Sequence, residues 1–142
     1  MVDAGVLYSA ADLADPDHES AVATLRDWGG ELVSSPLTLA EADHLILSRL
    51  GIDAEIAFAK GLAGAFTVTA LDARSLNAAA QLCERYRDLE LGLADASIIV
   101  LAARYGTRSL ATFDQRHFRA VTALTGGAFE LLPADAPGVA SR

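Results

Sequence analysis

The sequence predicts a single α/β domain, a three-layer α/β/α sandwich around a central, mainly parallel sheet of four to five strands. Short apolar segments alternate along the chain with longer segments whose apolar residues recur at helical spacing. Strands that are apolar along their whole length are typical of parallel sheets covered by helices on both faces. The length of 142 residues fits one domain with a sizeable core.

In the first half of the chain, turn and capping signals bound the expected elements. The turn Asp15-Pro16-Asp17 precedes the first helix, and Gly29-Gly30 ends it. Ser35 followed by Pro36 is typical of a helix start, because serine caps the first turn and proline suits the first helical position. The expected elements are a strand over Met1–Leu7, a helix over His18–Trp28, a strand over Glu31–Ser34, a helix from Ser35-Pro36 to Leu50 and a helix over Ile52–Leu62.

The second half of the chain continues the alternation. Phe66 and Val68 give the next strand its apolar content, Asp72 is suited to cap the following helix, and Gly106 ends the last long helix. The expected elements are a strand over Ala65–Leu71, a helix from Asp72 to Arg87, a helix over Asp95–Tyr105, and strands over Ser109–Thr112 and Phe129–Leu132. Ligands in such folds bind outside the carboxyl ends of the strands, which is where we expect the chemistry.

We expect residues 1–132 to form the domain and residues 133–142, which carry Pro, Gly, Ser and Ala, to form a flexible tail. Cys83 is the only cysteine, so an intramolecular disulfide is impossible. The opening Met1-Val2-Asp3 places an acid where a signal peptide would be basic, and no apolar run approaches the roughly 18 residues of a membrane span. These features predict a cytoplasmic protein without a membrane segment.

The formal net charge of −8 argues against nucleic acid as a partner, because phosphate contacts usually require a basic surface. Positive charge is nevertheless concentrated near the C-terminus. The residues concerned are Arg104, Arg108, Arg116, His117 and Arg119. Two interpretations remain open, a solvated basic helix face and a weak RNA-binding surface.

Two carboxylates in the first third of the chain stand in apolar surroundings. Asp3 lies inside the expected first strand, where aspartate is disfavoured and a buried unpaired charge is costly. Glu41 lies in line with Leu37 and Leu45 on the helix that begins at Ser35. Each also has a structural interpretation: a frayed N-terminus would leave Asp3 in solvent, and Glu41 could lie at the edge of the apolar column.

Two further carboxylates lie at the ends of elements in the second half. Asp95 precedes a very apolar helix and projects on the side of Ile98 and Ala102, although it could also be the N-cap of that helix. Asp114 follows the strand Ser109–Thr112, where a turn or helix-cap role is equally open. Four carboxylates converging without a counterion would repel, by about 4 kcal/mol for each close pair. A hard divalent cation such as Mg²⁺ or Mn²⁺ reverses the sign, and such sites serve in-line displacement at phosphorus.

Four stretches of the chain resemble the signature stretches of PIN-domain nucleases. They are Val2-Asp3-Ala4-Gly5-Val6-Leu7, Glu41, Leu93-Ala94-Asp95-Ala96 and Thr112-Phe113-Asp114-Gln115-Arg116-His117-Phe118. The resemblance spans Val2 to about Leu132, and its last stretch is the most specific. It departs from the family in having only Met1 and Val2 before the first aspartate, and in having Gly5 where many members carry Ser, Thr or Asn.

The resemblance implies a PIN-like α/β/α nuclease in which Asp3, Glu41, Asp95 and Asp114 bind Mg²⁺ or Mn²⁺ and are the catalytic residues. It also implies that the hydroxyl of Thr112 supports the acid pocket. A stand-alone domain of this length resembles a VapC-type toxin, commonly a homodimer, which cleaves structured RNA and is inhibited by a cognate VapB-type antitoxin. Alternatives are an RNA-processing PIN-like nuclease without an antitoxin and a non-catalytic PIN-like scaffold. A phosphatase with a nucleophilic Asp3 is disfavoured, because Gly5 stands where its second aspartate would be.

Overall fold

The computed structural model describes residues 1–137 of the chain, and its strands form one parallel layer. Strand β1 (Val33–Ser34) pairs with β2 (Thr67–Val68), and β3 (Ser109–Ala111) pairs with β4 (Glu130–Leu132). Val2 lies between the two pairs: it forms a parallel bridge with Ala111, and its N–H donates to the carbonyl of Val33 at 2.9 Å. The chain near Val2 therefore joins the strands into one layer, in the order β2, β1, Val2, β3, β4.

The expected first strand over Met1–Leu7 is wrong beyond Asp3. Helix α1 (Ala4–Ala11) begins directly after Asp3, which has extended backbone angles and accepts a hydrogen bond from the N–H of Ala4. An aspartate that precedes small residues is a favoured N-cap, and this local hydrogen bond starts a helix where apolar content alone suggests a strand. This difference affects the site, because the backbone of Asp3 is hydrogen-bonded to a strand and its side chain caps a helix.

After α1, the helices in the first half of the chain follow the sequence signals closely. Ser35 caps α3 (Pro36–Leu50) by accepting a hydrogen bond from the N–H of Thr38 at 3.1 Å. Gly51 separates α3 from α4 (Ile52–Ala65) and has a φ of 89°, a backbone conformation that favours glycine. Helix α2 (His18–Arg26) is two residues shorter than expected. Because α4 continues to Ala65, the strand expected over Ala65–Leu71 shrinks to β2.

The second half contains a helix that the sequence analysis does not predict. The expected helices appear as α5 (Ala73–Arg85), followed by the 3-10 helix η1 (Arg87–Leu89), and as α6 (Leu93–Arg104). The unpredicted helix, α7 (Gln115–Ala120), has only six residues and begins after Asp114. Helix α6 starts two residues before Asp95, and its residues from Ala96 to Ala102 are all buried. No helix in residues 1–137 is long and apolar enough to cross a membrane.

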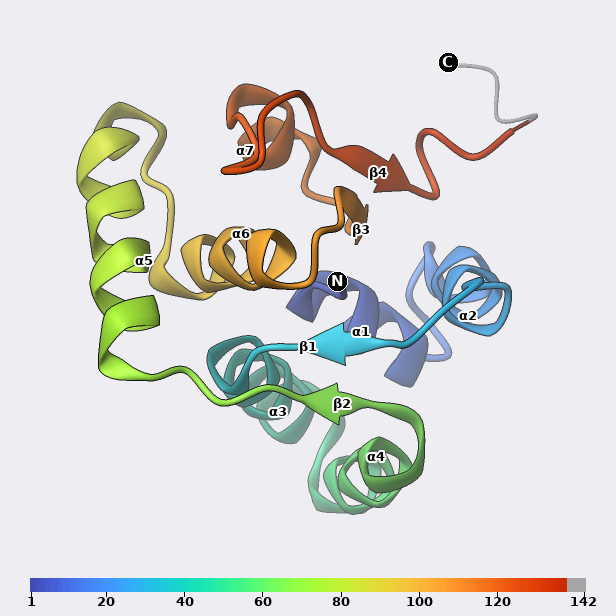
Figure 1. The fold of residues 1–142 in the computed structure, drawn as a ribbon. Coiled ribbons are helices and arrows are strands. Elements are labelled where there is room, and N and C mark those ends of the chain that lie inside the picture. Colours follow the sequence, from blue (N-terminus) through green and yellow to red (C-terminus); the bar gives the residue numbers. More distant parts are fainter. Residues whose placement is uncertain (138–142) are drawn as a thin grey trace.

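Two hydrophobic cores lie on opposite faces of the strand layer. Successive residues of a strand point to opposite faces, and Leu110 and Ala111 of β3 belong to different cores, as do Met1 and Val2. One core is formed mainly by α5, α6 and α7 with the strands, and the other by α1, α2 and α3. Helices therefore cover both faces of the strands, as Figure 1 shows, which is the predicted three-layer arrangement. Residues 138–142, half of the segment expected to be a flexible tail, lie outside the described residues.

Candidate metal centre

Asp3 is fixed in place by contacts on both of its carboxylate oxygens. Oδ1 accepts a hydrogen bond from the N–H of Ala4 at 2.6 Å, and Oδ2 accepts one from the hydroxyl of Thr112 at 2.7 Å. The backbone N–H of Asp3 donates to the carbonyl of Ala111 at the end of β3. The residue is only 7% exposed, and this burial raises the pKa of its carboxyl, while the two hydrogen bonds oppose the rise. Asp3 is thus a buried, oriented carboxylate rather than a frayed terminal residue.

Thr112 connects Asp3 to the segment that carries Asp114. The residue directly follows β3 and is 1% exposed. Its hydroxyl oxygen donates to Asp3 and accepts a hydrogen bond from the backbone N–H of Asp114 at 2.9 Å. One hydroxyl therefore positions two of the acids at the carboxyl end of β3, where the fold class predicts ligand binding.

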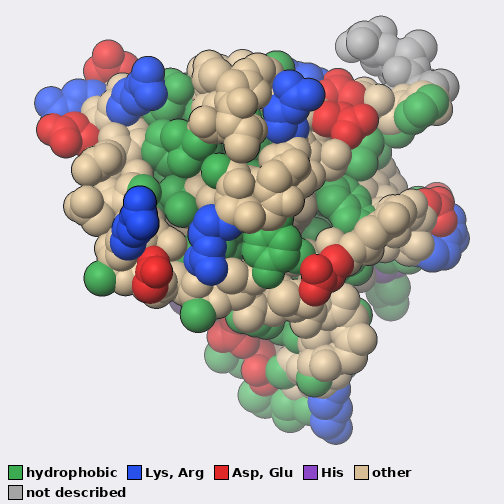
Figure 2. All heavy atoms as spheres, in the orientation of Figure 1, with side chains coloured by type: hydrophobic (Ala, Val, Ile, Leu, Met, Phe, Trp, Pro, Cys, Tyr) green, Lys and Arg blue, Asp and Glu red, His purple; other side chains and the backbone are tan. Residues whose placement is uncertain are grey.

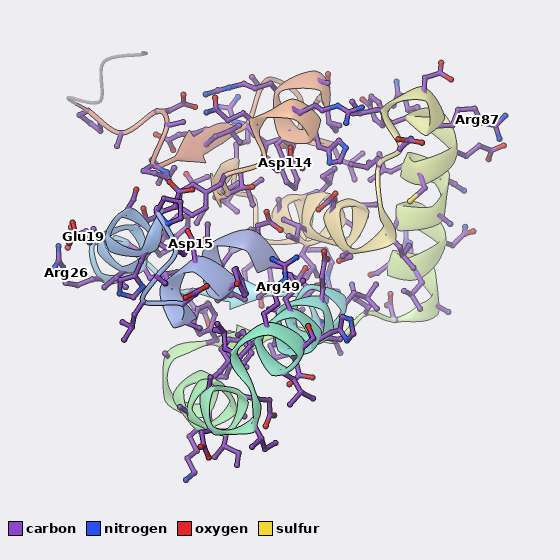
Figure 3. All side chains as sticks on the ribbon, turned by 180° about the vertical axis from the view of Figure 1, so that it is seen from behind. Asp15, Glu19, Arg26, Arg49, Arg87 and Asp114 are labelled. Carbon is purple, nitrogen blue, oxygen red and sulfur yellow. The ribbon has the colours of Figure 1, made fainter. Side chains whose placement is uncertain are left out.

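Asp114 is both a helix cap and a neighbour of other charged groups. Its Oδ1 accepts a hydrogen bond from the backbone N–H of His117 at 3.1 Å, which caps α7. Its Oδ2 lies 2.8 Å from Nδ1 of the same histidine. Figure 3 shows Asp114 between α7 and α6. Asp114 therefore caps α7 through Oδ1, while its Oδ2 faces the site.

Asp95 is not the N-cap that the sequence leaves open, because α6 begins at Leu93 and its N-cap is Gly92. Asp95 is the third residue of the helix, and its side chain is 19% exposed. Asp95 Oδ2 lies 3.3 Å from His117 Nδ1. A mostly buried carboxylate without a capping bond points to a role outside helix initiation.

Glu41 lies on α3 and is exposed, so it stands at the edge of its apolar column rather than within the core. Its negative charge nevertheless raises the pKa of both Asp3 and Asp95. Such an effect requires that the carboxylates lie near one another. Glu41 is therefore an exposed acid within electrostatic range of Asp3 and Asp95.

The pKa of Asp95 shows how the four acids act together. Burial is the largest cause of its rise from 3.8 to about 6, and the negative charge of Asp3 is the next. His117 opposes the rise, and Glu41 and Asp114 add to it. All three other acids thus contribute to the potential at Asp95. The cluster brings several negative charges together, and it would be stabilised by a cation.

His117, a candidate RNA-binding residue from the sequence, lies beside two of the acids. Ligand atoms of Asp95, Asp114 and His117 all lie within 4.8 Å of one another. Its other ring nitrogen, Nε2, lies 3.1 Å from the carbonyl of Leu89. The spacing is the signal that could have placed His117. Once Asp114 caps a helix, the residue three positions later lies on the same face of that helix.

The donor set fits a hard divalent cation. Carboxylate oxygens dominate it, and Asp95 and Asp114 offer oxygens close enough to share one ion. Asp3 and Glu41 add charge from the buried side and from the solvent side. An imidazole nitrogen beside these oxygens is compatible with Mn²⁺ as well as Mg²⁺.

Two of the arginines near the C-terminus have partners other than the four acids. Arg104 ends α6, at the opposite end from Asp95, and its Nη1 donates to the carbonyl of Ala70. Arg119 forms an ion pair with Asp135. Arg116 is exposed on α7, close in sequence to Asp114. Basic and acidic side chains are interspersed on the face seen in Figure 2.

The larger cavity lies away from the acids. It has a volume of about 750 Å³, a mainly apolar lining, and walls that include Met1, Trp28, Val33 and Pro133. None of the four acids is among its lining residues. The cavity does include the amino terminus of Met1, whose pKa burial lowers to about 6. The carboxyl groups whose pKa values are raised, those of Asp3 and Asp95, are not among its lining residues.

Comparison with known proteins agrees with the geometry. The sequence profile of the PIN domain matches residues 1–124. The chain is 38% identical over 134 residues to the protein named Ribonuclease VapC26 of Mycobacterium tuberculosis (strain ATCC 25618 / H37Rv), an alignment that covers 94% of this chain and 99% of the relative. The crystal structure of M. tuberculosis VapC20, described as a Sarcin-Ricin loop cleaving toxin, superimposes with a TM-score of 0.74 at 21% identity, covering 80% of this chain and 88% of that one.

Proposed function

The chain belongs to the PIN-domain family, and from this premise we propose that it is a Mg²⁺- or Mn²⁺-dependent endoribonuclease that cleaves structured RNA as the toxin of a VapBC-type toxin–antitoxin pair. The observation that carries the proposal is the arrangement of the acids: ligand atoms of Asp95, Asp114 and His117 lie within 4.8 Å of one another, and the hydroxyl of Thr112 links Asp3 to the backbone of Asp114. The relative that is 38% identical over nearly the whole chain is itself named a ribonuclease.

Each acid has a distinct task in the proposed reaction. Asp95 and Asp114 are the direct carboxylate ligands, because they offer oxygens within 4.8 Å of one another. Asp3, held by Thr112, supplies a fixed negative charge from the buried side. Glu41 adds a carboxylate on the exposed side of the site, where water and substrate enter. When bound, the cation would activate water and neutralise charge at the phosphate.

The RNA contacts are expected to be few. Arg104, Arg108, Arg116 and Arg119 remain candidates among the residues that the sequence offers, whereas the ring of His117 faces Asp95 and Asp114. Arg116 is the strongest of them, because it is exposed on the helix that Asp114 caps. The other arginines are proposed to act on more distant phosphates. A net charge of −8 then confines RNA attraction to this part of the surface.

The proposed protein partner is a VapB-type antitoxin, and the toxin itself is proposed to be a homodimer in the cytoplasm. An apolar groove of about 280 Å³ between α1, α2 and α4 suits a hydrophobic antitoxin segment; Leu7, Leu25, Phe58 and Phe66 are among its walls. An antitoxin Arg or Lys among the four acids would neutralise the charges that the metal otherwise neutralises. Inhibition of this kind weakens as Mg²⁺ is raised.

Cleavage of a structured RNA tests the proposed function. The parent should cut in Mg²⁺ or Mn²⁺ and stop cutting in chelator, and Asp95→Asn should cut at least about 100-fold more slowly, since it loses a metal ligand. Asp53→Asn, an exposed acid on α4, is the matched control and should retain the parental rate. Cleavage by Asp95→Asn at the parental rate would remove the site from the reaction. Binding of RNA without cleavage in either metal would favour the scaffold alternative.

A further inference from the structure

His117 presents one ring nitrogen to the protein backbone and the other to the acids. Nε2 lies 3.1 Å from the carbonyl oxygen of Leu89, which can only accept, so Nε2 carries a proton. In the neutral ring, Nδ1 then carries a lone pair. That lone pair faces Oδ2 of Asp114 at 2.8 Å and Oδ2 of Asp95 at 3.3 Å.

The Nδ1 atom is buried, and within residues 1–137 no partner meets the geometry of a hydrogen bond to it. The two carboxylates lie at ion-pair distance but are not oriented for hydrogen bonding. A lone pair beside two carboxylates is repulsive unless a cation lies between them. A ring whose far nitrogen donates to a backbone carbonyl is also the usual support of a metal-ligating histidine.

We propose that Nδ1 of His117 is a direct ligand of the divalent cation, together with Asp95 and Asp114, and that it makes the site prefer Mn²⁺ over Mg²⁺. The inference rests on the proposed function, because it concerns the same metal centre. Mg²⁺ prefers oxygen ligands, whereas imidazole nitrogen strengthens binding of Mn²⁺ and later transition ions. An all-carboxylate site would discriminate less between the two metals.

The direct test is electron spin echo spectroscopy of Mn²⁺ bound to the whole protein. Coupling of Mn²⁺ to ¹⁴N is expected in the parent and should vanish in His117→Gln. The matched control is His44→Gln, an exposed histidine on α3, which should keep the coupling. Calorimetric titration should show that His117→Gln loses at least about tenfold in Mn²⁺ affinity, and less in Mg²⁺ affinity.

A second variant keeps the test decisive if His117→Gln does not fold. His18→Gln combined with His44→Gln leaves His117 as the only histidine, and the ¹⁴N coupling should persist. Mn²⁺ that binds in an Asp95-dependent manner without ¹⁴N coupling would overturn the His117 proposal and leave the metal centre standing, with His117 only an ion-pair partner of the acids. Failure of Mn²⁺ to bind the parent at all would overturn both proposals.

Discussion

Asp95 is a carboxyl whose pKa burial and the neighbouring charges raise to about 6. It is mostly buried on α6, and the other three acids raise its pKa. A carboxyl whose pKa is higher in the folded chain than in the unfolded chain binds its proton more tightly when folded. Its contribution to stability therefore falls as pH rises from the unfolded pKa through the folded pKa, here from about 4 to about 6.

Replacing Asp95 by asparagine should consequently stabilise the metal-free protein at neutral pH. The expected gain is up to about 3 kcal/mol in free energy of unfolding at pH 7.5, since each pKa unit corresponds to about 1.4 kcal/mol. The gain should disappear below about pH 4, where the parent carboxyl is protonated in both states. Urea denaturation in chelator measures it, with Asp53→Asn as control. An Asp95→Asn variant that is less stable than the parent at pH 7.5 would show that the carboxylate is structurally satisfied without metal.

Thr112→Val tests the support of Asp3. The change removes the donor to Asp3 and the acceptor for the N–H of Asp114 at a buried position. We expect a loss of about 2 kcal/mol in free energy of unfolding and a further rise in the pKa of Asp3. Weaker Mn²⁺ binding should follow, measured by calorimetry. Thr112→Ser, which keeps the hydroxyl, should restore most of the binding; no rescue would assign the effect to packing of the methyl group.

At the scale of elements, a buried hydroxyl pair joins the helix that carries Glu41 to the helix that carries Asp95. The hydroxyl oxygens of Ser35 and Ser97 lie 2.6 Å apart, and Ser97 donates to the carbonyl of Ala94 at 2.6 Å. Ser35 also caps α3. Ser35 thus begins α3, and its contact with Ser97 sets the position of α3 against α6.

Ser35→Ala removes both the cap and the contact between the helices. The expected cost is about 1–3 kcal/mol in free energy of unfolding, measured by urea denaturation. Cleavage should also slow, because Glu41 moves with the start of α3. Ser48→Ala is the matched control on the exposed part of the same helix and should change stability by less than about 0.5 kcal/mol. Equal effects of the two variants would contradict this account of how α3 is placed.

The elements that the sequence predicts correctly are those with local signals. Ser35 with Pro36 and the break at Gly51 are decided within a few residues, so α3 appears with the expected ends. The strand predicted after Asp3 is wrong because an aspartate before Ala4 is compatible both with a strand and with the N-cap of a helix. Only the residues packed around it decide between the two. Helix α7 is too short to show helical periodicity. Missing it also hid the position of His117.

At the scale of the whole molecule, the acids meet where strand ends and helix starts from distant parts of the chain come together. Asp3 follows the strand contact of Val2, and Asp114 follows β3. The fold class and the family resemblance predict this region, because both place chemistry at the carboxyl ends of the strands. Neither predicts that Glu41 is exposed or that Asp95 lies within its helix, since both depend on how α3 and α6 pack.

The net charge of −8 leads to a prediction for RNA binding. Few phosphates should be neutralised, so affinity should depend less steeply on salt than for a basic nuclease. Arg116→Ala should weaken RNA binding and lower the slope of log K against log salt by about 1. Filter binding in the Asp95→Asn background measures this without cleavage. Arg26→Ala, which removes an exposed arginine paired with Asp27, is the control. Identical slopes for both variants would exclude Arg116 from the RNA contact.

The most direct test of the account is to locate Mn²⁺ by its anomalous scattering in a crystal of the protein soaked in the ion. The account predicts a peak roughly 2 Å from carboxylate oxygens of Asp95 and Asp114, with Asp3 and Glu41 facing it directly or through water. In a crystal of Asp95→Asn the peak should weaken or vanish. A peak confined to other surface acids, or unchanged density in Asp95→Asn, would contradict the claim that these four carboxylates form a metal-dependent active site.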